Sequence, residues 1–151
     1  LVLPVYDIQG VMTSIQFIDA DGNKLFLEGG RKTGCYCPIG KIDDRLYICE
    51  GYATAATVHR ATHGHAVAVA FDCANLEPVA VAMRGKYQDL RIIIAGDNDQ
   101  WKPERGNPGK THAIEAARAV DGEYTFPDFT GFDVSGEPTD FNDLYLLEGG
   151  E

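Results

Sequence analysis

The chain of 151 residues lacks long apolar runs, and this absence limits where it can work. No stretch approaches the roughly 18–20 consecutive apolar residues of a membrane-spanning helix, so we expect no membrane span. No signal peptide is visible, but the chain begins with Leu1 rather than methionine, and a shortened N-terminus would hide one. We therefore expect a fragment of a longer cytoplasmic polypeptide. A hydrophobic content of 44% is enough for one domain with its own core.

Cysteines are too few and too scattered to organise a zinc site or a disulfide framework. Only Cys35 and Cys37 lie close together, as C-x-C, and no second pair follows them. Cys49 and Cys73 lie in or beside apolar runs, where cysteine behaves as a small core residue. We expect neither bound zinc nor structural disulfides.

Positive charge is scarce, and the imbalance is concentrated at one end of the chain. The net charge is −10, which on its own disfavours nucleic acid as a partner. Residues 1–44 contain 4 basic and 6 acidic side chains, residues 45–111 contain 8 and 7, and residues 112–151 contain 1 and 10. The cationic side chains in the second half of residues 45–111 indicate either a solvated surface or a basic patch beside a functional site. These side chains are Arg84, Lys86, Arg91, Lys102, Arg105 and Lys110.

The stretch GNPGKT, residues 106–111, is similar to a phosphate-binding P-loop but is incomplete. The full pattern needs a glycine five positions before Gly109, where Glu104 stands. The pair Asn107–Pro108 is instead typical of a helix N-cap and first turn. Lys110, in that first turn, remains a candidate phosphate contact.

The first 44 residues predict a small β-rich segment that precedes the main domain. Residues 11–18 are rich in β-branched and aromatic types, which favour a strand. Residues 19–24 contain the Asp-Gly turn signal, and the sequence LFLEG at 25–29 resumes a strand, so we expect a hairpin. Residues 29–40 form a glycine-rich connector. We interpret residues 1–44 as an N-terminal extension.

From residue 45 the pattern changes to apolar strands that alternate with helices. Continuous apolar strands in this alternation predict a parallel sheet of about four strands, covered by helices on both faces. This places an α/β domain of the Rossmann-like kind over residues 45–151. The predicted strands cover residues 45–50, 66–71, 91–96 and 123–127.

The segments between these strands carry helix signals. Residues 51–64 are alanine-rich and end at Gly64, a favourable C-terminal residue. Asn75 is a candidate N-cap for a helix over 75–87, with Pro78 in its first turn. The apolar stripe of this second helix consists of Leu76, Val79 and Met83.

An acidic residue follows each of the first three strands, and two more stand in the segment PTDFND after the fourth. Ligands of open α/β sheets bind beyond the carboxyl ends of the strands, so we expect several of these carboxylates to converge. Any single acid here is also an ordinary loop residue or helix cap. The residues concerned are Glu50, Asp72, Asp97, Asp99, Asp140 and Asp143.

Converging carboxylates need a cation, because at close quarters they raise one another's pKa. Oxygen ligands without a histidine or cysteine cage favour Mg²⁺ or Mn²⁺ over zinc. Such an ion retains coordination positions for phosphate oxygens, which is the usual chemistry of phosphoryl transfer. Gly51, directly after Glu50, either lets a phosphate approach the backbone N–H groups of the next helix or is simply a turn glycine.

An apolar strand ending in Glu-Gly, followed by a later apolar strand ending in D-x-D, resembles the Toprim domain. The segment from LYICEGYATAATVHR to PVAVAMR, followed by RIIIAGDND, is most similar to Toprim domains in primase and primase-helicase proteins of plasmids, phages and mobile elements. The upstream FLEGGRKTGCYCPIG and the closing PTDFND are also similar to that group. The resemblance covers nearly the whole chain, most strongly residues 45–143.

The resemblance implies roles for individual residues. Glu50 matches the family glutamate, the acid/base of nucleotidyl transfer or a partner of the metal. Asp97 and Asp99 match the D-x-D that coordinates Mg²⁺, and Asp140 and Asp143 resemble later acidic positions near it. The chain departs from the family at Gln100, where many members have glycine. The loop from Gln100 to Gly106 is also long and carries Trp101, and we expect it to be mobile.

The activity implied is that of a DNA primase, which makes a short RNA primer from nucleoside triphosphates on a single-stranded DNA template with Mg²⁺ or Mn²⁺. Helicase or zinc-binding domains are then expected in the same polypeptide. Two alternatives stay open: strand cleavage of the Toprim nuclease or topoisomerase kind, and a non-catalytic module that organises a replication complex. Candidate contacts to phosphate or nucleic acid are Gly51, Arg84, Lys86 and Lys110.

Overall fold

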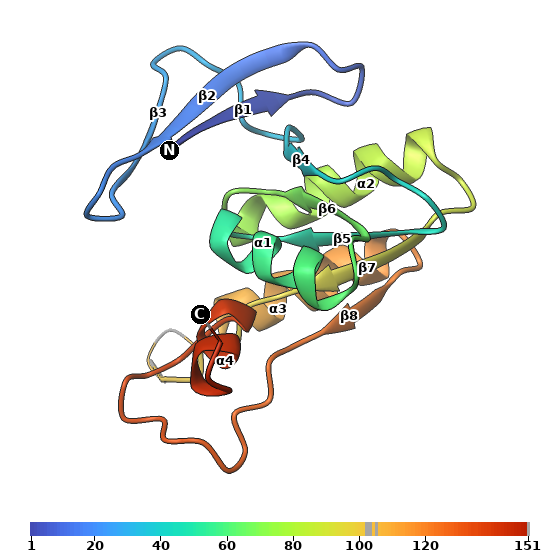
Figure 1. Ribbon diagram of the computed structural model, residues 1–151. Helices are drawn as coiled ribbons and strands as arrows, with labels where there is room; N and C mark the ends of the chain where they lie inside the picture. The colour runs from blue at the N-terminus through green and yellow to red at the C-terminus, as the bar shows by residue number, and fades with distance from the viewer. Residues whose placement is uncertain (102–103, 105, 151) are drawn as a thin grey trace.

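The computed structural model describes residues 1–101, 104 and 106–150, and it contains a small antiparallel sheet above a larger, mostly parallel one (Figure 1). The strands are β1 (Val2–Tyr6), β2 (Met12–Ile18), β3 (Lys24–Phe26), β4 (Cys37–Ile39), β5 (Arg45–Cys49), β6 (Ala66–Val69), β7 (Arg91–Ala95) and β8 (Glu123–Thr125). The helices are α1 (Tyr52–Ala61), the 3₁₀ turn η1 (Cys73–Asn75), α2 (Leu76–Lys86), α3 (Pro108–Ala119) and α4 (Phe141–Leu147).

The N-terminal strands form the small sheet in the order β1-β2-β3. β2 and β3 pair antiparallel, which confirms the predicted hairpin. Its turn places Gly22 at φ +83°, a left-handed conformation that glycine adopts without strain. Leu3 and Val5 of β1 are buried on the side that faces the rest of the molecule.

The larger sheet has the strand order β4-β6-β5-β7-β8. β6, β5, β7 and β8 run parallel, as predicted. β4 was not predicted: it lies inside the stretch expected to be a connector and pairs antiparallel with β6. It has three residues with a central Pro38, which gives no strand pattern in the sequence, and proline fits there because β4 is an edge strand.

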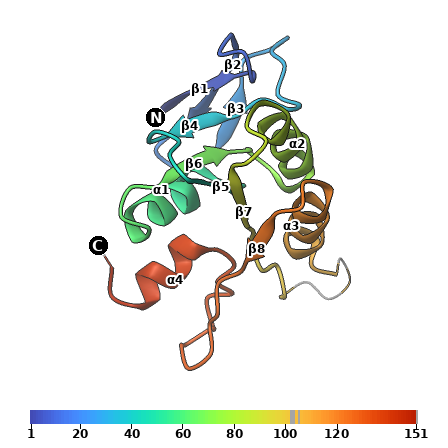
Figure 2. The same ribbon diagram turned by 90° about the vertical axis from the view of Figure 1, so that its right-hand side faces the viewer.

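Helices cover both faces of this sheet. Figure 2 shows α1 on one side and α2 with α3 on the other. All four residues of β6 and the last four of β7 are buried, as expected for strands packed on both faces. One core lies between the sheet and α2 with α3, and the other between the sheet and α1. The predicted stripe of Leu76, Val79 and Met83 is fully buried.

The predicted helix ends are confirmed in part. Asn107 caps α3 by accepting the N–H of Lys110, with Pro108 at the first helical position. α1 ends at Ala61, and Gly64 follows at φ +95°. Asn75 stands before α2, but its side chain makes no capping hydrogen bond. Among the described residues, no helix is both long and apolar enough to cross a membrane.

Candidate active site at the carboxyl edge of the sheet

The carboxyl ends of β5 and β7 lie side by side and deliver Glu50 and Asp97 to the same edge of the sheet. The two strands pair in parallel with Cys49 opposite Ala95, so both acids leave the sheet within two residues of that pair. On the other side of β5, Ala70 donates its N–H to the carbonyl of Cys49 at 2.8 Å. The predicted convergence of strand ends is therefore present in the backbone.

Glu50 and Asp97 each place one carboxylate oxygen, Oε1 and Oδ1 respectively, where it is buried and accepts no hydrogen bond from the described residues. Burial, with the nearby charge of Asp99, raises the pKa of Glu50 to about 7. Burial, with the charge of Glu50, raises the pKa of Asp97 to about 8. Buried oxygens without a partner fit a bound cation, which would neutralise both groups, and an all-carboxylate donor set suits Mg²⁺ or Mn²⁺.

Asp99 is half-buried and already oriented. Its Oδ2 accepts the backbone N–H of Gly109 at 3.0 Å. Between the two aspartates, Asn98 donates its N–H to the carbonyl of Thr139 at 2.7 Å. The D-N-D segment is thus fixed from two directions, by the start of α3 and by the segment before α4.

Asp140 and Asp143 have structural partners of their own. The Asp140 carboxylate accepts the backbone N–H of Asp143, and the Asp143 carboxylate accepts the backbone N–H of Asp140. This reciprocal pair is a capping box at the start of α4. Asp140 also accepts the hydroxyl of Thr54 at 2.6 Å. Both acids add negative charge that raises the pKa of Asp97, so they belong to the surroundings of the site and chiefly hold α4 there.

Sequence reasoning missed Lys32, which lies in the connector between the two sheets. Its ammonium pairs with Asp72, which follows β6, and lies 5.5 Å from the ring centroid of Phe26. The charge of Asp72 contributes to the raised pKa of Glu50, so this cation lies close to the carboxylate edge. A lysine in a glycine-rich stretch gives no signal of such a position.

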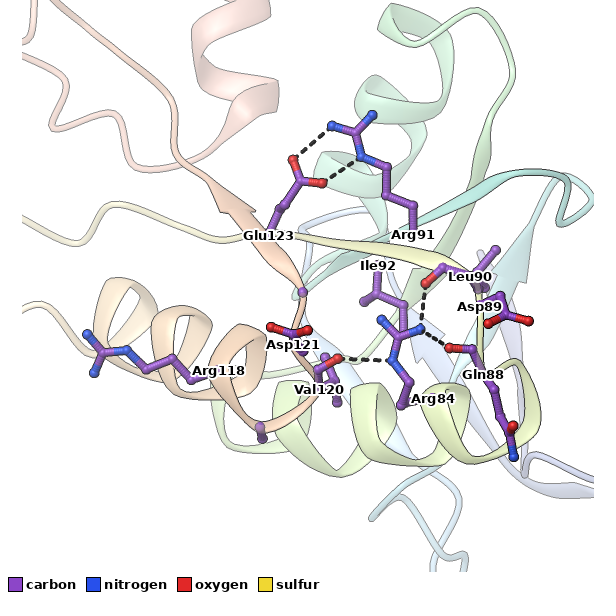
Figure 3. Close-up of a pocket in the computed structure, with 12 residues that line it drawn as sticks. Arg84, Gln88, Asp89, Leu90, Arg91, Ile92, Arg118, Val120, Asp121 and Glu123 are labelled. Atoms are coloured by element: carbon purple, nitrogen blue, oxygen red, sulfur yellow. Dashed lines mark hydrogen bonds and ion pairs between the residues drawn. The ribbon is translucent and has the colours of Figure 1, made fainter.

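Of the two alternatives for the cations, a basic patch beside the site does not apply to Arg84. Its guanidinium donates to the carbonyls of Val120, Gln88 and Leu90 at 2.7–2.9 Å, in a groove of about 590 Å³ at the amino end of β7 (Figure 3). That is the end of the strand away from Asp97. Because its N–H groups donate to main-chain oxygens, we assign Arg84 a structural role in holding these turns together.

The other predicted cations have different positions. Lys86 donates to the carbonyl of Ile8, and Arg91 forms an ion pair with Glu123 at the start of β7. Lys110 lies in the first turn of α3, three positions after the cap, 5.4 Å from the ring of Phe126. Positions 102, 103 and 105 of the Gln100–Gly106 loop, which include Lys102 and Arg105, lie outside the described residues. Trp101 donates its indole N–H to the carbonyl of Pro138.

A second group of metal-type ligands lies at the opposite, amino edge of the sheet. Asp43, Asp44 and His65 are the group of three in the described part of the chain whose ligand atoms all lie within 4.8 Å of one another. Both aspartates are exposed, and Asp44 forms two hydrogen bonds with Arg45. Because solvent and Arg45 already satisfy these acids, we regard the buried, unpartnered oxygens of Glu50 and Asp97 as the stronger cation site.

The fold and this edge define an open α/β domain with acidic strand ends suited to a divalent cation and phosphate groups. A sequence model described as the Toprim domain matches residues 45–151. The chain therefore belongs to the Toprim family, as the Glu-Gly and D-x-D motifs predicted.

Two curated relatives, each named DNA primase TraC of Escherichia coli, match the chain over 134 residues. They are 46% and 43% identical to it and cover 84% of its length. The chain spans only 12% and 9% of their lengths, so it corresponds to a small part of those proteins.

Two solved structures share the fold. The primase fragment of the bacteriophage T7 primase-helicase protein matches with a TM-score of 0.64 and 16% identity, over 96% of this chain and 56% of that one. A complex of the T7 lagging-strand DNA polymerase with primase domains of two gp4 subunits, bound to an RNA/DNA hybrid and dTTP, also matches. There the TM-score is 0.64 and the identity 18%, over 98% of this chain and 71% of that one. Both comparisons support the α/β architecture with its N-terminal β-rich segment.

Proposed function

We propose that this chain is the metal-dependent catalytic domain of a DNA primase, which joins nucleotides into a short RNA primer on a single-stranded DNA template. The observation that carries the proposal is the pair of buried, unpartnered carboxylate oxygens of Glu50 and Asp97 at the carboxyl edge. The names of the TraC relatives and the family membership support primase chemistry at that edge.

Asp97 and Asp99 are the residues that would hold the ion, with Glu50 beside them. Bound there, Mg²⁺ or Mn²⁺ would supply charge neutralisation for the triphosphate and for the charge that develops during transfer. The donor set fits this ion because it consists of carboxylates on rigid strand ends. Asp140 and Asp143 would add negative charge around it and keep α4 in place.

Glu50 is suited to manage the proton of the attacking 3′-hydroxyl. A general base must lie within reach of the proton that it accepts, and Glu50 leaves β5 at the same edge as the two aspartates that would hold the ion. Gly51, at the N-cap of α1, leaves room for phosphate oxygens near the first backbone N–H groups of that helix. Lys110 at the start of α3 is a second phosphate contact.

The partners follow from the activity. Single-stranded DNA and nucleoside triphosphates are the proposed substrates. A helicase domain in the same polypeptide is supported by the T7 relative, which is a primase-helicase protein. A zinc-binding domain and a cytoplasmic location stay predictions, as does the division of the chain at residue 45.

Primer synthesis by the intact protein tests the proposal. Glu50→Gln and Asp97→Asn each remove one acid with almost no change in shape, so each should lower the yield of labelled primer roughly 100-fold or more. Asp43→Asn is the matched control, because it removes an exposed acid at the other edge of the sheet. It should retain activity.

Full activity of Glu50→Gln or Asp97→Asn would contradict the proposal. The same assay separates the alternative functions. Cleavage of labelled single strands in the absence of nucleotides would indicate a Toprim nuclease or topoisomerase. If the protein neither makes primers nor cleaves strands, and Mn²⁺ does not affect the carboxylates, the chain is a non-catalytic module.

A further inference from the structure

The start of α3 contacts the D-N-D segment directly, which gives the incomplete P-loop GNPGKT a different role. The side-chain oxygen of Asn107 accepts the N–H of Asp99 at 2.9 Å and that of Lys110 at 3.1 Å. The Asn107 amide also donates to Asn98 Oδ1 at 2.8 Å. One side chain thus joins the helix cap to both residues that follow Asp97.

Gly109, two positions further on, contacts the aspartates through its backbone. Its N–H donates to Asp99 Oδ2 at 3.0 Å. A Cβ atom at this position would lie 2.8 Å from the Asp97 carbonyl oxygen and 2.8 Å from Asp99 Oδ2, closer than such contacts occur. Only glycine lets the helix approach the D-N-D segment this closely.

We propose that Asn107 and Gly109 are positioning residues that fix the orientation of Asp99 toward the cation. The Gly109 N–H holds Oδ2, and Oδ1 accepts no hydrogen bond from the described residues, so one oxygen is anchored and the other is left for the ion. Residues that orient a metal ligand typically change metal affinity by about 10–100-fold when they are lost.

A purely structural role for Asn107, as the cap of α3, predicts something different. Serine is also a good N-cap, so Asn107→Ser retains an acceptor for the helix. The single hydroxyl oxygen of serine cannot replace both the amide oxygen, which accepts the Asp99 N–H, and the amide nitrogen, which donates to Asn98 Oδ1. The variant therefore separates capping of the helix from positioning of the aspartates.

Mn²⁺ binding to the chain, followed by electron paramagnetic resonance, tests this inference, which rests on the proposed function. Asn107→Ser and Gly109→Ala should each weaken Mn²⁺ binding about 10-fold or more while the melting temperature of Asn107→Ser stays near that of the native chain. In the metal-free chain, the Asp99 amide should exchange with solvent faster in Asn107→Ser. Gly85→Ala is the matched control, because its added methyl meets no atom within 4 Å, and its Mn²⁺ affinity should be unchanged.

Native affinity in Asn107→Ser, whose folding the melting curve checks, would overturn the inference even if Gly109→Ala fails to fold. Asp99→Asn distinguishes this failure from failure of the proposed site. If Asp99→Asn loses Mn²⁺ and Asn107→Ser does not, only the positioning role is wrong. If the native chain binds no Mn²⁺, or Asp99→Asn binds it normally, the metal site and the positioning role both fail.

Discussion

At the scale of single residues, the unusual feature is charge placed where it is costly. Glu50 and Asp97 follow strands that end in buried residues, and each leaves one oxygen without a partner among the described residues. Such groups destabilise a fold unless something neutralises them. Both were predictable from the sequence because each directly follows an apolar run, and parallel strands bring such positions together.

The raised pKa values predict how the metal-free protein responds to pH. Between the ordinary carboxyl pKa and about 8, the folded state retains protons on Glu50 and Asp97 that the unfolded chain has released. Stability should therefore fall as pH rises through this window and level off above it. Asn at position 97 cannot titrate, so Asp97→Asn should be more stable than the native chain at pH 8, by about 1–2 kcal/mol.

Urea unfolding between pH 5 and pH 9, without divalent metal, measures this effect. Asp128→Asn is the control, since that exposed carboxyl has its pKa lowered by Thr130 and titrates only in acid. A native stability that rises from pH 5 to pH 9, or an Asp97→Asn variant weaker than the native chain at pH 8, would contradict the account.

Arg84 and Lys32 show what the sequence could not reveal at this scale. Arg84 donates to carbonyls from two separate turns, and Lys32 reaches Asp72 across the connector. Both roles depend in part on a partner far away in sequence, Val120 for Arg84 and Asp72 for Lys32. Charge alone gives no sign of which cation lies near the carboxylates.

At the scale of elements, local signals predicted α2 and α3, but not the role of Asn75 or the existence of β4. Asn107 and Pro108 form a start signal that acts within four residues. Asn75 carries a similar signal, but its side chain instead accepts the Gly34 N–H and donates toward the carbonyls of Lys32, Cys35 and Ala70. A long-range network therefore replaced the predicted cap.

Asn75 should accordingly be a strong determinant of stability. Its side chain is buried, and Asn75→Ala would remove its hydrogen bonds with the Gly34 N–H and with the carbonyls of Cys35 and Ala70. We expect a loss of about 2–4 kcal/mol in the free energy of unfolding, measured by urea denaturation. Asn23→Ala, in the exposed hairpin turn, should change it by less than about 0.5 kcal/mol. If Asn75→Ala lowers the free energy of unfolding no more than Asn23→Ala does, the Asn75 network does not stabilise the fold.

At the scale of the whole molecule, the connector brings the small sheet to the carboxylate edge. Lys32 pairs with Asp72, and Phe26 of β3 packs edge-on against Phe71 with ring centroids 5.3 Å apart. The N-terminal segment thus borders the proposed site. The order of apolar strands, turns and helices along the sequence predicted this segment and the parallel sheet, but their mutual placement depends on contacts between residues distant in sequence.

The two groups of acids lie at opposite ends of the same sheet, and this makes the central claim directly testable. The measurement is anomalous diffraction from crystals of the protein soaked in Mn²⁺, which locates each bound ion. We predict a peak between Asp97 and Asp99, with Glu50 beside it, that disappears in Asp97→Asn. Mn²⁺ found only at Asp43, Asp44 and His65, with none at the carboxyl edge, would contradict the account.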